Sequence, residues 1–399
     1  MHRALLALAV LLVLPASTEA APPWSAPRDV SGPFTFVDGL WAAGGLIGWR
    51  SGDGEAGAPV GRSGDPVFFG TGGGAVAIVR PVGSNRDPRS ELRVALRSGG
   101  RFGPSRRVAK HPWIAPPTLA GNARGDLAVA WFEDRSVVSD RVYVALRRAG
   151  HAFGKPIRLA TGRIRGVSVA VGSRGDVLVA WNTVDKVRTR LKRRGHGFGR
   201  AETLRADPAW AAKLRPAVAS SGRAYVAWAS QGLFEGGDSG AAYYDVAVRP
   251  AGAARFRRAQ RLDGLPAHRL GGPLDLALTG RGNAIAAWVS DRVRVAETGA
   301  DGRFGPPRDL TAPGAVVDDD VTRLGGIDVA TTPAGARLVT WTVPGPLVQV
   351  AFGAAGGPLG APEDVATGET PRGAFPGPAI AFQLRGADGV HVQEVTRAG

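Results

Sequence analysis

Aromatic and imidazole side chains lie in three segments that hold similar positions between repeated strand patterns. An aromatic ring offers a flat apolar face that loses little entropy on binding, and polar neighbours fix the orientation of a ligand. Such residues indicate recognition of a sugar or a peptide, whereas packing between neighbouring strand modules is the structural alternative for the tryptophans. The candidates are His111 and Trp113 in 109–117, Trp210 in 205–216 and His268 in 263–273.

A fourth segment, 229–245, joins two strand patterns and adds Glu235 and Tyr243 to the same predicted binding surface. It contains the string GDSG, which surrounds the nucleophile of serine proteases. No histidine and aspartate stand in a matching context, so the sequence does not support a protease site. We expect a binding loop or a lid here.

Several carboxylates fall in predicted loops between the second and third strands of the repeated modules. Paired carboxylates can act as general acid and base, and their separation decides the reaction. A polysaccharide hydrolase or lyase is therefore the enzymatic alternative to a non-catalytic binding protein. Its candidate residues are Glu133, Asp134, Glu235 and Asp291.

The string VDDDV places Asp318, Asp319 and Asp320 in one predicted loop. Carboxylate oxygens are calcium ligands, which makes Asp318 and Asp320 weak metal candidates. EF-hand spacing is absent, and adjacent carboxylates in an extended loop cannot all face one ion, so solvation or pairing with arginine is the simpler interpretation. Glycine-rich 70–79 leads into a strand, whereas a phosphate cradle needs a helix. The sequence predicts no cofactor.

Residues 1–20 have the pattern of a secretory signal peptide, with a basic start, an apolar run and small residues before the expected cleavage site. No other stretch is long and apolar enough to span a membrane. The absence of cysteine excludes disulfides and thiolate metal sites. We expect a secreted protein that is extracellular or associated with the cell envelope.

The formal net charge is +16, and arginine supplies nearly all of it because the chain has only five lysines. Such a charge supports solubility, and it makes an anionic polymer an alternative partner to a neutral glycan, a cell-wall polymer or an extracellular protein. The densest basic run, 188–200, is expected to be a solvated blade edge that charge protects against edge pairing. It lacks interleaved aromatic residues, so the sequence does not favour nucleic acid.

One strand pattern recurs along the chain about every fifty residues and ends on a tryptophan. In 125–134, GDLAVAWFED, large residues alternate with alanines, so both faces are apolar but unequal in size. Such a strand belongs in a sheet that is covered on both sides. The small residues beside each tryptophan are expected to let adjacent sheets approach closely. The five tryptophans are Trp131, Trp181, Trp228, Trp288 and Trp341, with weaker copies that end at Val79 and Phe382.

A second pattern follows each tryptophan strand: an alternating strand, a glycine turn and a strand that opens on Phe-Gly, as in 141–159. A short apolar segment precedes each tryptophan strand. Four antiparallel strands repeated every forty to sixty residues describe an all-β fold, the β-propeller, over residues 21–399.

The termini predict how the propeller is completed. The segment 24–30, WSAPRDV, matches 304–310, FGPPRDL, whereas the last hairpin pattern stops at the C-terminus before its outer strand. The N-terminal segment is therefore expected to supply that outer strand. Residues 31–75 are irregular or form a degenerate eighth blade. Seven outer strands predict seven blades, and they begin at Trp24, Phe102, Phe153, Phe198, Phe256, Phe304 and Leu359.

The pattern resembles secreted bacterial propellers of the sialidase-like, BNR-repeat kind, across the whole predicted mature chain. Sialidases carry Asp-boxes of the form Ser-x-Asp-x-Gly-x-x-Trp between the third and fourth strands, where this chain reads RRAGHAFG or TGADGRFG. No arginine triad or Tyr/Glu nucleophile pair can be matched, so the resemblance implies the fold and no catalytic residue. We expect an exported, non-catalytic binding or scaffold protein that recognises its partner through the propeller loops.

Overall fold

The structure is a computed structural model. It describes residues 24–30, 37–43, 46–51, 62–63, 67–69, 73–84, 87–98, 101–134, 140–206, 209–233, 239–264, 272–280, 282–314, 326–343, 345, 347–374, 378–385, 387 and 390–397.

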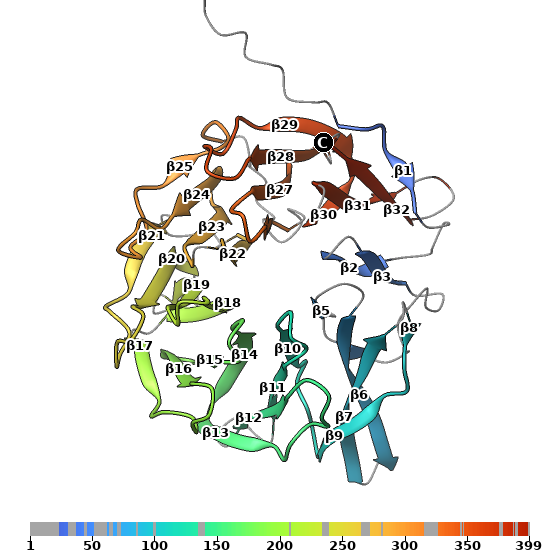
Figure 1. The fold of residues 1–399 in the computed structure, drawn as a ribbon, viewed down its shortest axis with the longest axis vertical. Helices are drawn as coiled ribbons and strands as arrows, with labels where there is room; N and C mark the ends of the chain where they lie inside the picture. Colours follow the sequence, from blue (N-terminus) through green and yellow to red (C-terminus); the bar gives the residue numbers. More distant parts are fainter. Residues whose placement is uncertain are drawn as a thin grey trace, which may run out of the picture.

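The described residues form β-strands and no helix, arranged as sheets around a common axis (Figure 1). Blade 1 has six strands: β4 (Arg62–Ser63), β5 (Val67–Phe69), β6 (Gly73–Ser84), β7 (Asp87–Ser98), β8 (Arg101–Phe102) and β9 (Arg106–His111). Blade 2 has β10 (Thr118–Gly121), β11 (Leu127–Glu133), β12 (Asp140–Arg147) and β13 (Ile157–Gly162). Blade 3 has β14 (Ile164–Val171), β15 (Val177–Thr183), β16 (Lys186–Lys192) and β17 (Glu202–Ala206).

The remaining blades repeat the same antiparallel order from the innermost to the outermost strand. Blade 4 has β18 (Ala209–Val218), β19 (Ala224–Leu233), β20 (Ser239–Arg249) and β21 (Gln260–Gly264). Blade 5 has β22 (Leu274–Leu278), β23 (Ala284–Val289), β24 (Val293–Glu297) and β25 (Arg308–Asp309). Blade 6 has β26 (Asp328–Thr331), β27 (Arg337–Val343), β28 (Leu347–Gly353) and β29 (Glu363–Thr367). Blade 7 has β30 (Glu369–Ala374), β31 (Ala379–Arg385), β32 (Val390–Thr396) and β1 (Arg28–Asp29).

The tryptophans that end the repeated strands hold neighbouring blades together. All five are fully buried. Trp181 of blade 3 packs in one cluster with Ala128 and Ala130 of blade 2, and Trp288 of blade 5 packs in one cluster with Ala227 and Ala229 of blade 4. A large ring on one sheet therefore fills the space that small residues leave on the preceding sheet. The alternation predicted from the sequence is confirmed.

The N-terminal strand completes blade 7, as predicted from the matching segments. β1 pairs with β32, with Arg28 opposite Glu394 and Asp29 opposite Gln393 (Figure 1). The indole Nε1 of Trp24 donates a 3.0 Å hydrogen bond to Glu363 of blade 6. Trp24 and β1 thus contact the last two blades.

Seven blades are present in the described residues, so the seven-bladed fold is confirmed. A further hairpin of β2 (Val37–Ala43) and β3 (Leu46–Ser51) forms a two-stranded sheet of its own. It lies between blades 7 and 1, where β2 contacts β30, β31 and β5 (Figure 1).

Candidate anion-binding groove

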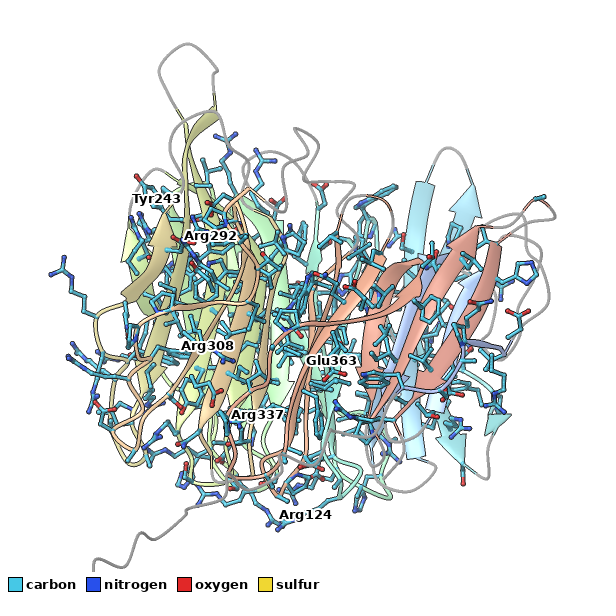
Figure 2. All side chains as sticks on the ribbon, turned by 90° about the horizontal axis from the view of Figure 1, so that it is seen from above. Arg124, Tyr243, Arg292, Arg308, Arg337 and Glu363 are labelled. Atoms are coloured by element: carbon cyan, nitrogen blue, oxygen red, sulfur yellow. The ribbon has the colours of Figure 1, made fainter. Side chains whose placement is uncertain are left out.

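The strand order gives each blade two distinct ends. In an antiparallel sheet, the turns between strands one and two and between strands three and four lie at the same end, which we call the turn face. The connections between strands two and three and from one blade to the next lie at the opposite end, the loop face. Figure 2 shows Arg124, from a first turn, at the opposite edge from Tyr243 and Arg292, which lie near the start of third strands.

A groove of about 850 Å³ opens between blades 3 and 4 toward the turn face. One wall is the segment 197–204, which leads from the turn of blade 3 into β17, and the other is 254–258 of blade 4. Leu191, Leu204 and Phe256 line the groove and pack with the apolar cluster around Trp228. Its volume lies within the range that is typical of ligand sites.

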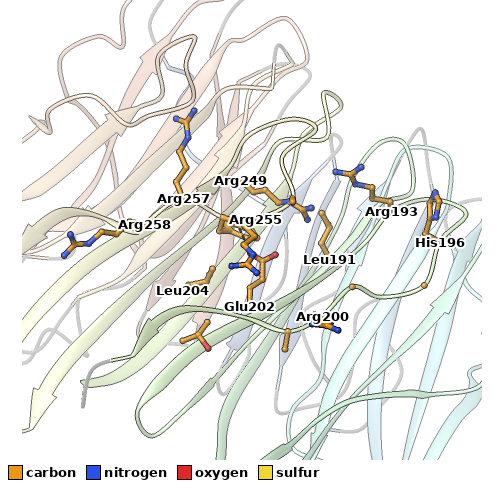
Figure 3. Close-up of a pocket in the computed structure, with 16 residues that line it drawn as sticks. Leu191, Arg193, His196, Arg200, Glu202, Leu204, Arg249, Arg255, Arg257 and Arg258 are labelled. Carbon is orange, nitrogen blue, oxygen red and sulfur yellow. Dashed lines mark hydrogen bonds between the residues drawn. The ribbon is translucent and has the colours of Figure 1, made fainter.

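Tight turns present the charged residues of this groove. The backbone N–H of His196 donates to the carbonyl of Arg193 over 3.0 Å, and the N–H of Ala253 donates to the carbonyl of Pro250 over 3.1 Å. The third residue of each turn is a glycine with positive φ, because a side chain would be strained in that conformation. The two hairpins have the same geometry. Arg193 of the first and Arg249 of the second point toward each other across the blade junction (Figure 3).

The groove is strongly cationic. Glu202 is the single carboxylate among its described lining residues, and no ion pair joins any of the lining arginines to a carboxylate within the described part of the chain. Like charges held close together repel each other, and a bound anion relieves that repulsion. The six arginines are Arg193, Arg200, Arg249, Arg255, Arg257 and Arg258.

Backbone contacts fix the interior of the groove. Glu202 Oε2 accepts a 2.9 Å hydrogen bond from the N–H of Phe256, and Arg249 Nε donates to the carbonyl of Ala253 over 2.8 Å. Burial lowers the pKa of the Arg249 guanidinium, with a smaller opposing effect from Glu202 and a contribution from Arg193. An arginine remains charged under such a shift, so Arg249 is a buried cation held in place by a carbonyl.

On the loop face, the structure brings together His111, Trp113 and Glu133. His111 Nδ1 lies 3.6 Å from Glu133 Oε2, and the imidazole centroid lies 4.9 Å from the ring of Tyr143. Trp113 is 50% exposed, so it does not fill a gap between blades, and the next residue, Ile114, pairs through its backbone with Glu133. Glu133 itself is 2% exposed.

Tyr243 lies elsewhere on this face, and its ring is covered. The guanidinium carbon of Arg261 lies 3.7 Å from the ring centroid, and Arg261 Nε also donates to Asp245 over 2.8 Å. Asp291 is paired with Arg292 at 2.7 Å. The hydrogen bonds from Arg292 lower the pKa of the Asp291 carboxyl, which therefore stays ionised.

Sequence reasoning misplaced two of the candidate segments. Trp210 is paired opposite Gln231 inside strand β18, so 205–216 is mostly strand and not a connecting loop. The reason is that β18 continues through a bulge at Lys213, whose φ is 54°, and keeps its hydrogen bonds to β19. Likewise, β19 and β20 extend into 229–245, and Ser239 of the GDSG string begins β20.

Asp134 follows β11 directly and is exposed, whereas five other candidates lie outside the described residues. They are Glu235, His268, Asp318, Asp319 and Asp320. Within the described part of the chain, no group of three histidine, aspartate or glutamate side chains could hold a metal ion. The same part contains no helix that is long and apolar enough to cross a membrane.

Sequence reasoning also missed the groove as a site. The run 188–200, which the sequence predicts as a solvated blade edge, supplies part of the lining on the blade 3 side, with Arg193 and Arg200. On the blade 4 side, 254–258 follows the equivalent turn one module later and contains Arg255, Arg257 and Arg258. Two arginine-rich turns at the same position in consecutive modules were the available signal.

No family model and no curated protein matches the chain. Solved structures of similar fold include a lectin from Burkholderia pseudomallei, at 13% identity and a TM-score of 0.52, over 87% of this chain and 99% of the lectin. A microbial sialidase has a TM-score of 0.41 at 10% identity, over 77% of this chain and 73% of its own. A polysaccharide lyase described as an ulvan lyase has a TM-score of 0.44 at 10% identity, over 83% of this chain and 93% of its own. At these identities the likeness concerns the fold alone, and the chain is a seven-bladed β-propeller.

Proposed function

We propose that this chain is an exported, non-catalytic protein that binds an acidic glycan or cell-wall polymer in the groove between blades 3 and 4. The observation that carries the proposal is the set of six arginines that line the groove beside one carboxylate. The guanidinium fork matches the paired oxygens of carboxylate, sulfate and phosphate groups. The net charge of +16 adds a long-range attraction for the same ligands.

A glycan fits better than a small anion for two reasons. The groove is open and has a volume of about 850 Å³, which is large for a single phosphate or carboxylate. Its lining also offers apolar surface from Leu191, Leu204 and Phe256 beside the charges. A sugar ring has both an apolar face and polar edges, so it can use both kinds of surface. The lectin of similar fold is a sugar-binding protein by its name.

Export is part of the proposal, and residues 1–20 support it as a signal peptide. The ligand then belongs to the cell surface or the medium. Mass spectrometry of the protein from culture supernatant should find a mature N-terminus at Ala21. A protein that stays in the cytoplasm and keeps residues 1–20 would contradict the proposed export.

The binding test compares two double variants of equal charge. Arg255→Ala with Arg258→Ala removes two exposed groove arginines, whereas Arg158→Ala with Arg303→Ala removes two exposed arginines outside the groove. Affinity for immobilised polygalacturonate and chondroitin sulfate is measured by interferometry, with dextran as the neutral polymer. We expect the groove variant to lose about tenfold or more and the control to change by less than about threefold. Equal losses in both variants, or equal binding to dextran, would contradict the proposal.

A second candidate function is polysaccharide hydrolysis or elimination on the loop face, with Trp113 as a stacking platform. The contact between His111 and the buried Glu133 favours it, because a histidine and a carboxylate can exchange a proton. Release of reducing ends or of unsaturated uronate, absorbing in the ultraviolet, tests it directly. Product formation that His111→Ala abolishes would support catalysis in place of binding alone.

A further inference from the structure

A second groove, of about 500 Å³, adjoins the first on the turn face. Leu191, Arg193 and His196 line both grooves, so the two share a wall on the turn of blade 3. The second groove extends from this wall toward blade 2, where Arg124 lines it, and toward Gly222 of blade 4.

Two of the four arginines of the second groove come from one repeated turn. Blades 2, 3 and 4 each connect their first two strands through a turn with a positive-φ glycine, at Gly125, Gly175 and Gly222. The residue before the glycine is Arg124 in blade 2 and Arg174 in blade 3. Because the turns repeat with the blades, their guanidinium groups recur at the same level on the turn face.

The repeated turn also accounts for the close approach of Arg174 to blade 4. A Cβ atom added at Gly222 would collide with the Arg174 guanidinium, so the missing side chain there leaves room for the arginine. Arg174 lies at the boundary of blades 3 and 4, on the same side as Arg193. The two grooves therefore share Arg193, and the arginines that line them come from blades 2, 3 and 4.

The aspartates that follow the glycines of these turns accept hydrogen bonds from backbone N–H groups. Asp176 Oδ1 accepts a 2.7 Å hydrogen bond from the N–H of Arg194, and Asp126 Oδ1 accepts one of 3.1 Å from the N–H of Ala149. Burial opposes ionisation of Asp126, but the hydrogen bonds from Ala149 and Asn122 outweigh it and lower its pKa. Arg174 Nη2 lies 3.8 Å from Asp176 Oδ2, which is a weak pair on a half-exposed side chain. Among the described residues, nine arginines and two carboxylates line the two grooves together.

We infer that the two grooves form one track that binds a linear polyanionic glycan across blades 2, 3 and 4. The inference rests on the proposed function and extends it from a local site to a chain of several charged sugars. A single cluster would bind a short anion as well as a long one, whereas a track engages more charges as the chain lengthens.

The lining favours a glycan over a nucleic acid. Phe256 is the only phenyl, phenol or indole ring among the described lining residues, and it belongs to the first groove. Single-stranded nucleic acids are usually held by several aromatic rings on which successive bases stack. Sugars with a carboxylate or sulfate on each unit need no such platform.

The experiment measures the affinity of the full mature chain for a length series of oligogalacturonates. The track variant carries Arg124→Ala and Arg174→Ala, two exposed residues of the second groove, and the control is the double variant of Arg158 and Arg303. We expect wild-type affinity to rise with length. The track variant should match the wild type on short oligomers, lose about tenfold or more on long ones, and show a salt slope smaller by about two.

The outcomes separate the two proposals. If Arg255→Ala with Arg258→Ala leaves short oligomers bound normally, the proposed function itself is wrong. If that variant weakens short oligomers but the track variant has no length-dependent effect, only the track is wrong. Thermal unfolding of each variant confirms that it is folded. Competition by single-stranded DNA that is stronger than by an oligogalacturonate of equal charge would overturn the choice of a glycan.

Discussion

The carboxylate of Glu202 in β17 accepts a 2.9 Å hydrogen bond from the backbone N–H of Phe256 in the next blade. The single acid among the described lining residues of the groove therefore joins two blades, and within the described part of the chain no ion pair joins the surrounding guanidinium groups to a carboxylate. The Glu202 carboxylate thus bonds to the backbone of the next blade, and the arginines beside it form a cationic site.

Replacing Glu202 with glutamine tests this relationship. The glutamine carbonyl can still accept the N–H of Phe256, whereas the negative charge is removed. We expect affinity for acidic glycans to rise by up to about fivefold, and the free energy of unfolding to change by less than about 1 kcal/mol. Calorimetric titration and urea denaturation measure the two quantities. Weaker binding of acidic glycans by this variant would contradict the expectation that the Glu202 charge opposes their binding.

Replacing Trp24 with alanine should destabilise the propeller. The indole donates to Glu363, and the guanidinium carbon of Arg397 lies 5.5 Å from its ring centroid. We expect a loss of about 2 kcal/mol in the free energy of unfolding. Trp113→Ala is the matched control, because that side chain is half exposed and its removal should cost less than about 0.5 kcal/mol. Equal effects of the two substitutions in urea denaturation would show that the contacts of Trp24 with Glu363 and Arg397 do not stabilise the propeller.

Asp328 should make stability depend on pH. Burial raises the pKa of its carboxyl to about 6; the nearby Asp275 adds to the rise, and Arg372 and Arg215 oppose it. An unfolded aspartate has a pKa of about 4, so the folded state binds the proton more tightly, and stability falls as pH rises from about 4 to 6. We expect a fall of about 1 to 3 kcal/mol from this group.

Asp328→Asn should remove this fall, since the amide cannot ionise but can still accept the N–H of Gly373, as Asp328 Oδ2 does at 2.9 Å. Asp364→Asn is the control, because that carboxylate is exposed on β29. Denaturation curves at a series of pH values measure the difference. An unchanged pH profile in the Asp328 variant would exclude this carboxyl as its source.

Two buried tryptophans, one with and one without a hydrogen-bond partner, allow the contribution of a single hydrogen bond to stability to be measured. Trp288 Nε1 donates to Asp263 over 2.8 Å, whereas Trp181 Nε1 has no hydrogen-bond partner in the described part of the chain. Both side chains are fully buried. We expect Trp288→Phe to cost about 1 to 2 kcal/mol more than Trp181→Phe, because it removes a hydrogen bond to the charged Asp263 carboxylate, which among the described residues keeps only its 2.6 Å ion pair with Arg294 at that oxygen. Equal losses in thermal and urea unfolding would assign the cost to packing alone.

The sequence predicted the blades because their signals are local. In 125–134 the alternation of Leu127, Val129 and Trp131 with alanines is visible within one strand, and each side chain is buried as that pattern requires. The outer strand at the N-terminus was predicted as well, because its motif matches 304–310 in the same repeat. Repetition turns a weak local pattern into a reliable one.

The placement of Trp210 failed for the opposite reason. The segment 205–216 has proline and charged residues and reads as a connection, but hydrogen bonds to β19 extend the strand back to Ala209. Tertiary pairing decides such a boundary, and the residues themselves do not encode it locally.

The amino-acid sequence by itself determined the all-β repeat, the buried tryptophans, the seven blades and the excess of arginine, since each of these follows from patterns within one module or from composition. Only the tertiary structure decided that Arg200 and Arg255, more than fifty residues apart, line one groove, and that Glu202 bonds to a backbone amide and not to either of them. The physical reason is that the site lies between blades. Its geometry depends on how closely two sheets pack, and that distance is set by the buried side chains of both.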